Sequence, residues 1–169
     1  MQRTCIGKLK EKIGEEVLIN GWVDVRRDHG KLVFIDLRDV SGKVQMVALP
    51  CHKEAHEAVQ KLRSEWVVEI TGKVNKRPEK MINAKEVNGD LEIEILSAVV
   101  LNEATTPQFD ISGDGMEIGE DSRLKYRYLD LRRQRLQRNI RLRHEIIRFV
   151  RNSLSNEGFI EIETPILTK

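Results

Sequence analysis

Three neighbouring segments carry side chains that could bind single-stranded nucleic acid. Apolar residues alternate in KLVFIDLRD (31–39), and one face of that expected strand carries Val33, Ile35 and Leu37. Phe34 then points the other way, beside Arg38, and Arg26 and Gln45 from the adjoining segments fall on the same outer parity. An exposed ring stacks on bases, arginine neutralises phosphate and an amide can hydrogen-bond a base edge. The pattern predicts a nucleic-acid platform, with packing of Phe34 under a loop or neighbouring domain as the alternative.

Charged residues border this platform. The pairs 26–27 and 76–77 are basic and lie at expected strand ends, where they either reach phosphates or remain solvated. Four acids are interleaved with them: Asp24, Asp28, Asp36 and Asp39. These carboxylates either pair with arginines or reject the wrong nucleic-acid groups, and the sequence leaves both interpretations open.

No other segment assembles a complete catalytic or metal site. His52 and His56 have the i, i+4 spacing that can chelate a metal, but no third ligand is placed nearby, so a solvated helix face is favoured. Cys51 has no base partner to activate it. There is no glycine-rich phosphate loop, no Ser-His-Asp order and no HExxH motif. We expect no metal and no catalytic residue in this sequence.

The elements that must position the platform form a β-rich unit. Strands are expected at 16–26, 31–39, 43–48, 66–77 and 91–101, with a helix at 52–63 before the fourth strand. The inner face of the first strand is expected to carry Val17, Ile19, Gly21, Val23 and Val25. The order β-β-β-α-β-β, with a glycine inside the first and fourth strands, suits a mainly β, five-stranded OB-fold barrel, although another small barrel would share it.

After the barrel the sequence changes character. Residues 103–120 have the composition of a linker. Asp121 and Ser122 are positioned to cap a helix that begins at Arg123, and a second helix is expected over 136–155. Its apolar stripe comprises Ile140, Ile146, Ile147, Phe149, Val150 and Leu154. Asn156-Glu157-Gly158 is a stop signal, and 159–163 alternates as a strand.

These elements predict three regions. Residues 1–102 form the barrel domain, 103–133 a linker or hinge, and 134–169 the start of a second domain. The basic stretch 123–143 is an exposed face, an RNA-backbone contact, or a hinge whose arginines pair with acids of a partner domain.

Composition and charge exclude several classes of protein. The 169 residues carry a net charge of +2, but residues 120–151 alone hold ten Arg and one Lys against four acids, a local charge of +7. The chain is therefore not a uniformly basic nucleic-acid coat. At 40% hydrophobic and 33% charged residues, it resembles a water-soluble folded protein. It lacks a membrane-spanning run, a signal-peptide core and a cysteine framework, so a cytoplasmic location is expected.

Three segments, in order and spacing, resemble bacterial-type aspartyl-tRNA synthetases of class IIb. They are GWVDVRRDHGKLVFIDLRDVSGKVQ (21–45), RLKYRYLDLRR (123–133) and GFIEIETPILTK (158–169). The resemblance implies an OB-fold that binds the tRNA anticodon, a hinge, and the first helix and strand of a class II α/β catalytic domain. The last segment is similar to the family's motif 1, which places Phe159 and the proline Pro165 in a homodimer interface.

The resemblance also implies roles for the platform. Phe34 would stack on the central anticodon base and Gln45 would hydrogen-bond that base. The other implied anticodon-binding residues are Arg26, Arg27, Arg77, Asn83, Glu92 and His29. A histidine at position 29 is similar to family members that charge both aspartate and asparagine tRNAs. The expected partner is thus tRNA(Asp), with tRNA(Asn) as a second candidate, and neither DNA nor a membrane is expected.

The family's motifs 2 and 3, which hold ATP and aspartate, would follow Lys169. The full-length enzyme is expected to use ATP and Mg²⁺ to join aspartate to tRNA, whereas these 169 residues should bind tRNA without charging it. Three alternatives remain: a fragment of an asparaginyl- or lysyl-tRNA synthetase, a non-enzymatic OB-fold protein for single-stranded nucleic acid, and an arm that serves only for dimerisation.

Overall fold

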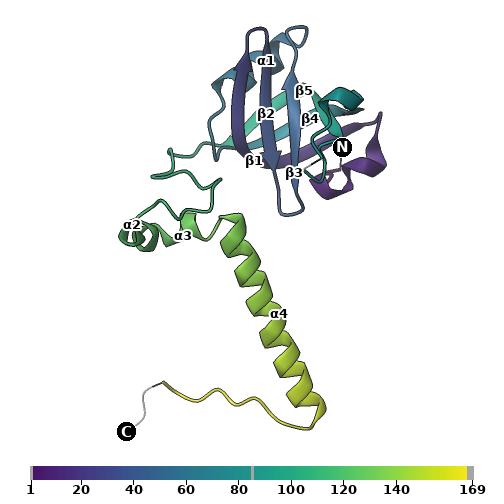
Figure 1. The fold of residues 1–169 in the computed structure, drawn as a ribbon. Helices are drawn as coiled ribbons and strands as arrows, with labels where there is room; N and C mark the ends of the chain where they lie inside the picture. The colour runs from purple at the N-terminus through teal and green to yellow at the C-terminus, as the bar shows by residue number, and fades with distance from the viewer. Residues whose placement is uncertain (1, 85, 167–169) are drawn as a thin grey trace. The chain divides into compact units, whose positions relative to one another are not determined.

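Five strands in the first part of the chain close into a barrel (Figure 1). The computed structural model describes residues 2–84 and 86–166. The strands are β1 (Glu16–His29), β2 (Leu32–Arg38), β3 (Lys43–Ala48), β4 (Val67–Lys76) and β5 (Leu91–Asn102). Their order is β1-β2-β3-β5-β4, and β1 also pairs with β4. Only β3 and β5 run parallel. The mainly β, five-stranded barrel predicted from the element order is confirmed.

The barrel interior is filled from every strand and from two helical segments. The predicted inner residues of β2, Val33, Ile35 and Leu37, are all buried. Helix α1 (Lys53–Lys61) packs two apolar residues, Ala55 and Val59, against this core. The 3₁₀ segment η1 (Ile6–Lys12) contributes Ile6 and Leu9, both fully buried. No helix or strand was predicted over these residues.

The glycines in β1 and β4 are required by close approach of neighbouring strands. A Cβ at Gly21 would lie 2.5 Å from the carbonyl oxygen of Arg38, and one at Gly72 would lie 2.6 Å from that of Glu94. Real side chains do not tolerate such distances to backbone atoms. The expectation that glycines in the first and fourth strands serve barrel closure therefore has a steric cause.

A β-bulge in β1 overturns one detail of the predicted alternation. The β1–β2 register shifts between Val23 and Val25, so that Val25 lies opposite Asp36 and Arg26 opposite Ile35. Because directly paired residues share a face of the sheet, Arg26 takes the parity of the buried residues. The prediction that Val25 lies on the inner face and Arg26 on the outer one was wrong.

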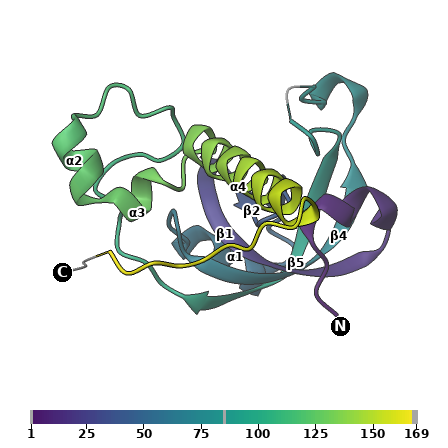
Figure 2. The same cartoon turned by 90° about the horizontal axis from the view of Figure 1, so that it is seen from below.

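The described residues from 107 onward form a second compact unit. Its helices are α2 (Glu120–Lys125), α3 (Arg127–Asp130) and α4 (Gln134–Asn156), and Figure 2 shows α2 and α3 as separate short helices. The predicted start at Arg123, capped by Asp121 and Ser122, was wrong, because α2 begins at Glu120 after Gly119 and no side chain caps it.

An arginine lies at the centre of this unit. Arg133 is fully buried, donates a hydrogen bond from Nε to Oδ1 of Asp130 at 3.0 Å and lies 5.3 Å from the ring centroid of Phe109. Arg127 also pairs with Asp130, at 3.0 Å. Two arginines of the basic stretch therefore pair with an acid inside their own unit, whereas the hinge interpretation, one of three left open, expected acids of a partner domain.

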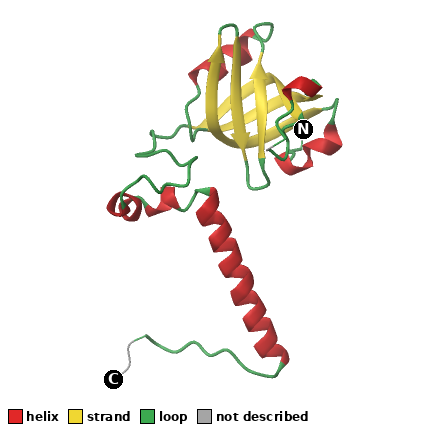
Figure 3. Cartoon of the chain, viewed as in Figure 1, coloured by secondary structure: helices red, strands yellow, loops and turns green. Residues whose placement is uncertain are grey.

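Helix α4 ends as the sequence predicts, but the strand expected after it does not form. Gly158 adopts a φ of +84°, and the backbone N–H of Phe159 donates to the carbonyl of Leu154 at 3.0 Å, as in a glycine-terminated helix. Residues 159–163 are extended without a sheet partner (Figure 3). A strand is defined by its ladder, so the alternation alone was insufficient. Residues 167–169 of the same segment lie outside the described residues.

The apolar stripe of α4 remains uncovered in this chain. Its members are exposed by 37–73%: Ile140, Ile146, Ile147, Phe149, Val150 and Leu154. Among the described helices, none combines the length and the apolar character needed to cross a membrane.

Candidate nucleic-acid interface

The outer face of β1, β2 and β3 carries the predicted aromatic platform. Phe34 is half-buried and lies opposite Arg27 of β1, because the bulge moves Arg27 onto the parity that the sequence assigned to Arg26. His29, at the end of β1, packs edge-to-face against the Phe34 ring, with centroids 5.5 Å apart and planes at 83°. The Phe34 ring thus contacts an exposed side chain at the end of β1, while part of Phe34 itself remains accessible to solvent.

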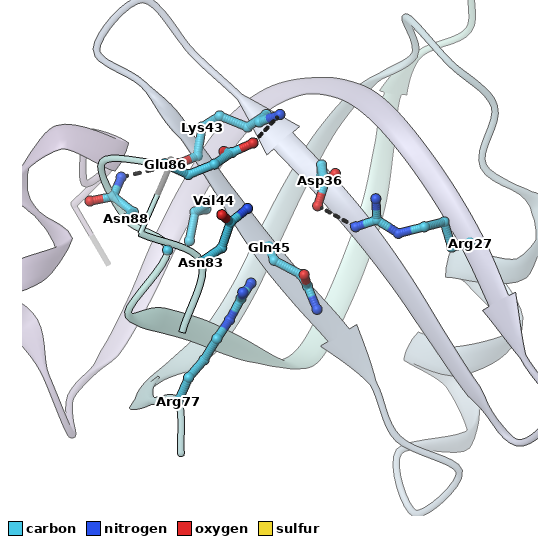
Figure 4. A pocket seen from close by; sticks show the side chains of 10 residues that line it. Arg27, Asp36, Lys43, Val44, Gln45, Arg77, Asn83, Glu86 and Asn88 are labelled. Atoms are coloured by element: carbon cyan, nitrogen blue, oxygen red, sulfur yellow. Dashed lines mark hydrogen bonds and ion pairs between the residues drawn. The ribbon is translucent and has the colours of Figure 1, made fainter. Parts of the chain in front are cut away.

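A pocket of about 270 Å³ opens beside this platform (Figure 4). Its lining comprises Arg27, Asp36, Lys43, Val44, Gln45, Arg77, Asn83, Glu86, Asn88 and Gly89. Four predicted site residues, Arg27, Gln45, Arg77 and Asn83, therefore converge from two strands and from the connection between β4 and β5. Figure 4 shows Gln45 and Arg77 projecting into the same space.

Each cation of the pocket has a carboxylate near it. Arg27 donates from Nη2 to Oδ1 of Asp36 at 2.8 Å. The Lys43 ammonium lies 2.9 Å from Oε1 of Glu86. Nε of Arg77 lies 3.9 Å from Oε1 of Glu92. The pocket therefore combines positive groups suited to phosphate with acids that balance them.

Gln45, which lines the pocket, is hydrogen-bonded to Glu92, which does not. Gln45 donates from Nε2 to Oε1 of Glu92 at 3.1 Å. Burial raises the pKa of the Glu92 carboxyl, although the charge of Arg77 and the hydrogen bond from Gln45 act in the opposite direction. An amide has two donor hydrogens and an acceptor oxygen, so Gln45 is chemically able to bond a base edge as well.

Two arginines assigned to the platform serve the barrel framework. Arg26 reaches away from Phe34: its guanidinium contacts the carbonyl oxygen of Gln60 at the end of α1 and lies 3.1 Å from Oδ2 of Asp28. Arg38 shares the parity of Phe34, but its guanidinium nitrogens lie 2.7–2.8 Å from the buried Glu65 carboxylate. Neither residue lines the pocket: the parity expected for Arg26 is corrected, whereas Arg38 keeps the parity of Phe34 but pairs with Glu65.

The interleaved acids pair with arginines. Asp36 pairs with Arg27, Asp28 with Arg26, and Asp24 with Arg38 at 3.4 Å. Asp39 instead accepts backbone N–H bonds from Ile6, Ser41 and Gly42, which fix the turn before β3 to η1. Of the two interpretations left open by the sequence, pairing holds for three of the four acids.

The histidines of the α1 segment have separate partners. Nε2 of His52 lies 3.1 Å from Oε1 of Glu94, and Nε2 of His56 lies 3.1 Å from the carbonyl oxygen of Lys31. Within residues 2–84 and 86–166, no three His, Cys, Asp or Glu side chains gather in a way that could hold a metal ion.

The two residues expected in a dimer interface belong to the second unit. Phe159 follows α4 and is 65% exposed, and Pro165 is exposed in the extended segment beyond it. They are not part of the barrel pocket.

Sequence reasoning named Asp36 as an acid bordering the platform, but it missed three other polar lining residues: Lys43 on β3, and Glu86 and Asn88 on the β4–β5 connection. A signal existed for Lys43, because alternation along β3 puts it on the same face as Gln45. No local signal existed for Glu86, since its partner lies 43 positions earlier in the sequence.

Comparison with known proteins adds a family to this geometry. Residues 17–101 match the model for the OB-fold nucleic acid binding domain, and residues 119–169 match that for class II tRNA synthetases (D, K and N). The aspartate–tRNA ligase of Oceanobacillus iheyensis is 51% identical over 99% of this chain, and the aspartate–tRNA(Asp/Asn) ligase of Natranaerobius thermophilus is 48% identical over 100%. The chain spans 29% of the length of each of these relatives.

Solved structures show the same fold. An aspartyl-tRNA synthetase from Entamoeba histolytica superposes with a TM-score of 0.86 at 25% identity, covering 99% of this chain and 40% of that protein. An asparaginyl-tRNA synthetase from Pyrococcus horikoshii gives a TM-score of 0.80 at 24% identity, covering 98% of this chain and 37% of that protein.

Proposed function

The chain belongs to the aspartyl-tRNA synthetase family, and we propose that its barrel recognises the anticodon loop of an aspartate tRNA. The observation that carries this proposal is the convergence of Arg27, Gln45 and Arg77 beside the half-buried Phe34 ring. A stacking surface, a base-edge hydrogen-bonding group and phosphate-binding cations are the components that single-stranded RNA recognition needs.

The residues take different roles in the proposed complex. Phe34 stacks on the central anticodon base and Gln45 hydrogen-bonds that base. Arg27 and Arg77 meet the loop backbone, where each exchanges its carboxylate partner for phosphate. The remaining proposed contacts are Glu92, Asn83 and His29, whereas Arg26 would have to leave Gln60 and Asp28 to take part.

For the whole protein we propose the aspartate–tRNA ligase reaction, in which aspartate is activated with ATP and transferred to tRNA. ATP and Mg²⁺ belong to that activation, and we assign neither to a residue described here. We further propose a cytoplasmic homodimer in which Phe159 and Pro165 contribute to the subunit interface, and we expect the 169 residues alone to bind RNA without charging it.

The proposed division is a barrel domain over 1–102, a hinge over 103–133 and the start of the catalytic domain from 134. The boundary between the two compact units falls between residues 106 and 107, a few residues beyond the end of β5 at Asn102.

Binding of three RNA stem-loops tests the proposal. We expect the loop with the aspartate anticodon to bind most tightly to the full 169-residue chain, ahead of the asparagine and lysine loops, with fluorescence anisotropy as the readout. If the loop with the asparagine anticodon binds within about twofold of the loop with the aspartate anticodon, the chain does not distinguish the two tRNAs strictly. His29 is the candidate residue for such relaxed selection. Equal binding of all three loops and of a scrambled loop would contradict anticodon recognition and favour a general single-strand binder.

A further inference from the structure

Lys43 is a pocket cation that neither the sequence analysis nor the family resemblance assigns to RNA. It precedes Gln45 by two positions on β3, so both side chains project from the same face of the barrel. Its ammonium lies 2.9 Å from Oε1 of Glu86 and 3.7 Å from Oδ2 of Asp24. Figure 4 shows the Lys43 and Glu86 side chains meeting at the pocket wall.

Glu86 is held beside Lys43 by a closed loop. The backbone N–H of Asn83 donates to the carbonyl of Gly89 at 3.1 Å, which closes the loop across its base. The buried Asn88 side chain donates to the carbonyl oxygen of Lys43 itself, also at 3.1 Å. Gly89 allows this tight path, since a Cβ there would meet the Asn83 carbonyl oxygen at 1.9 Å. Glu86 is therefore positioned by the fold, and not by its own ion pair alone.

The ion pair is accessible enough to be exchanged. The Lys43 side chain is 30% exposed and that of Glu86 is 38% exposed. Burial lowers the pKa of Lys43, but the hydrogen bond and charge of Glu86, together with the charges of Asp24 and Asp36, leave the pKa raised, so the ammonium is charged at neutral pH. A partly exposed ion pair contributes little to stability, so a phosphate contact can replace it.

We propose that Lys43 is a further phosphate-contacting residue of the RNA site and that Glu86 is its internal competitor. In the free protein the Glu86 carboxylate pairs with the Lys43 ammonium, and a phosphate of the bound RNA loop displaces that carboxylate. With Arg27 paired to Asp36 and Arg77 near Glu92, the same exchange would apply across the pocket. This inference rests on the proposed function, because it presupposes that RNA enters this pocket.

Removing the Glu86 charge tests the exchange. Glu86→Gln keeps the side chain's size and leaves the Asn88 and Gly89 anchors in place. We expect the full chain to bind the aspartate anticodon stem-loop about two- to fivefold more tightly, the fold-change for a partly exposed ion pair. The dependence of log affinity on log salt should steepen by up to about 0.7, the value for one unit of charge on a single strand, because the variant leaves the Lys43 charge without the Glu86 carboxylate that offsets it.

Two further variants make the test specific. Glu79→Gln changes the charge equally on the same β4–β5 connection, at an exposed position that does not line the pocket, and should leave binding unchanged. Lys43→Gln removes the proposed contact and should weaken binding by about two- to fivefold. Fluorescence-monitored unfolding, with both tryptophans, Trp22 and Trp66, in the barrel, checks that each variant is folded.

Unchanged affinity and salt dependence in Glu86→Gln would overturn the inference. Equally tighter RNA binding by Glu79→Gln would also overturn it, because that result would indicate a general charge effect. Unchanged RNA affinity in Lys43→Gln would overturn it as well, because it would show that Lys43 does not contact RNA. These results leave the proposed function standing whenever the unaltered chain still prefers the aspartate loop. Absence of that preference would contradict the proposed function and the inference together.

Discussion

The barrel pocket and the basic helix of the second unit differ in how they use charge. In the pocket, Arg27 and Lys43 each lie within 3 Å of a carboxylate, and Arg77 lies 3.9 Å from one. Residues 120–151 instead carry a local charge of +7, much of it on α4, whose apolar stripe is also exposed. The nearly neutral pocket, and not the strongly basic helix, has the aromatic ring and amide that single-stranded RNA needs.

Net charge is therefore a poor guide to the proposed RNA site in this chain. A surplus of positive charge attracts any polyanion, whereas recognition needs groups at fixed positions. The fixed positions come from the closed barrel, in which Arg27 and Lys43 pair with Asp36 and Glu86. On α4, Arg148 and Arg151 pair with Glu145 and Glu161, while the apolar stripe is exposed, as expected of a helix that packs against another protein surface.

Core substitutions give the largest expected difference between the two regions. Ile70→Ala, at a fully buried position in β4, should lower the free energy of unfolding by about 2–5 kcal/mol. Ile147→Ala, at a position of α4 that is 37% exposed, should change it by less than about 0.5 kcal/mol. Urea unfolding measures both, with tryptophan fluorescence for the barrel and circular dichroism for the helix. A large cost at Ile147 would show that α4 is covered in solution.

Aromatic substitutions give the next effect. Phe34→Ala should weaken binding of the aspartate anticodon stem-loop by about 1–3 kcal/mol, because one base loses its stacking partner. Phe149→Ala removes an aromatic ring that is 73% exposed on α4 and should leave RNA affinity unchanged. Fluorescence anisotropy measures both affinities. If Phe149→Ala proves as damaging as Phe34→Ala, the two regions share the binding of RNA.

Two carboxyl groups give a smaller effect with opposite signs. Burial raises the pKa of Glu92 in the barrel above its ordinary value of 4.5. In the second unit, hydrogen bonds from the Ser112 side chain and backbone lower the pKa of Asp110 below 3.8. Glu92 therefore favours the folded state below about pH 4.5 and loses that contribution as the pH rises through its folded pKa. Asp110 contributes above pH 3.8 and loses its contribution as the pH falls through its folded pKa.

Melting temperatures from pH 3 to pH 7 test these signs. Glu92→Gln should gain stability relative to the unaltered chain as the pH rises, and Asp110→Asn should lose it, since the amide cannot replace a charged acceptor. A Glu92→Gln difference that stays flat with pH would mean that the carboxyl is well solvated in the barrel.

Most of the barrel could be predicted from the sequence because its strands bury one face. Alternation located every strand to within a few residues, and the stop at Gly158 followed from its position after a helical stripe. The bulge after Val23 could not be predicted, since an inserted residue leaves the pattern of residue types almost unchanged. That single insertion exchanged the faces of the sheet expected for Arg26 and Arg27.

The remaining errors concern contacts between distant parts of the sequence. Glu86 meets Lys43 only because the barrel brings the β4–β5 connection to β3. Residues 159–163 alternate like a strand, but a ladder requires a partner, and none of the described residues supplies one. Periodicity indicates which side of an element is apolar, but it does not indicate which element packs or pairs against that side.

The most direct test of the central claim is to locate the bound RNA. A stem-loop with 5-iodouridine at the centre of the aspartate anticodon, cross-linked by light to the full chain, would identify by mass spectrometry the peptide that contacts that base. We predict that the cross-link falls on the peptide containing Phe34, in β2. A cross-link confined to residues 123–143 would contradict the account, because it would place the anticodon on the basic stretch of the second unit.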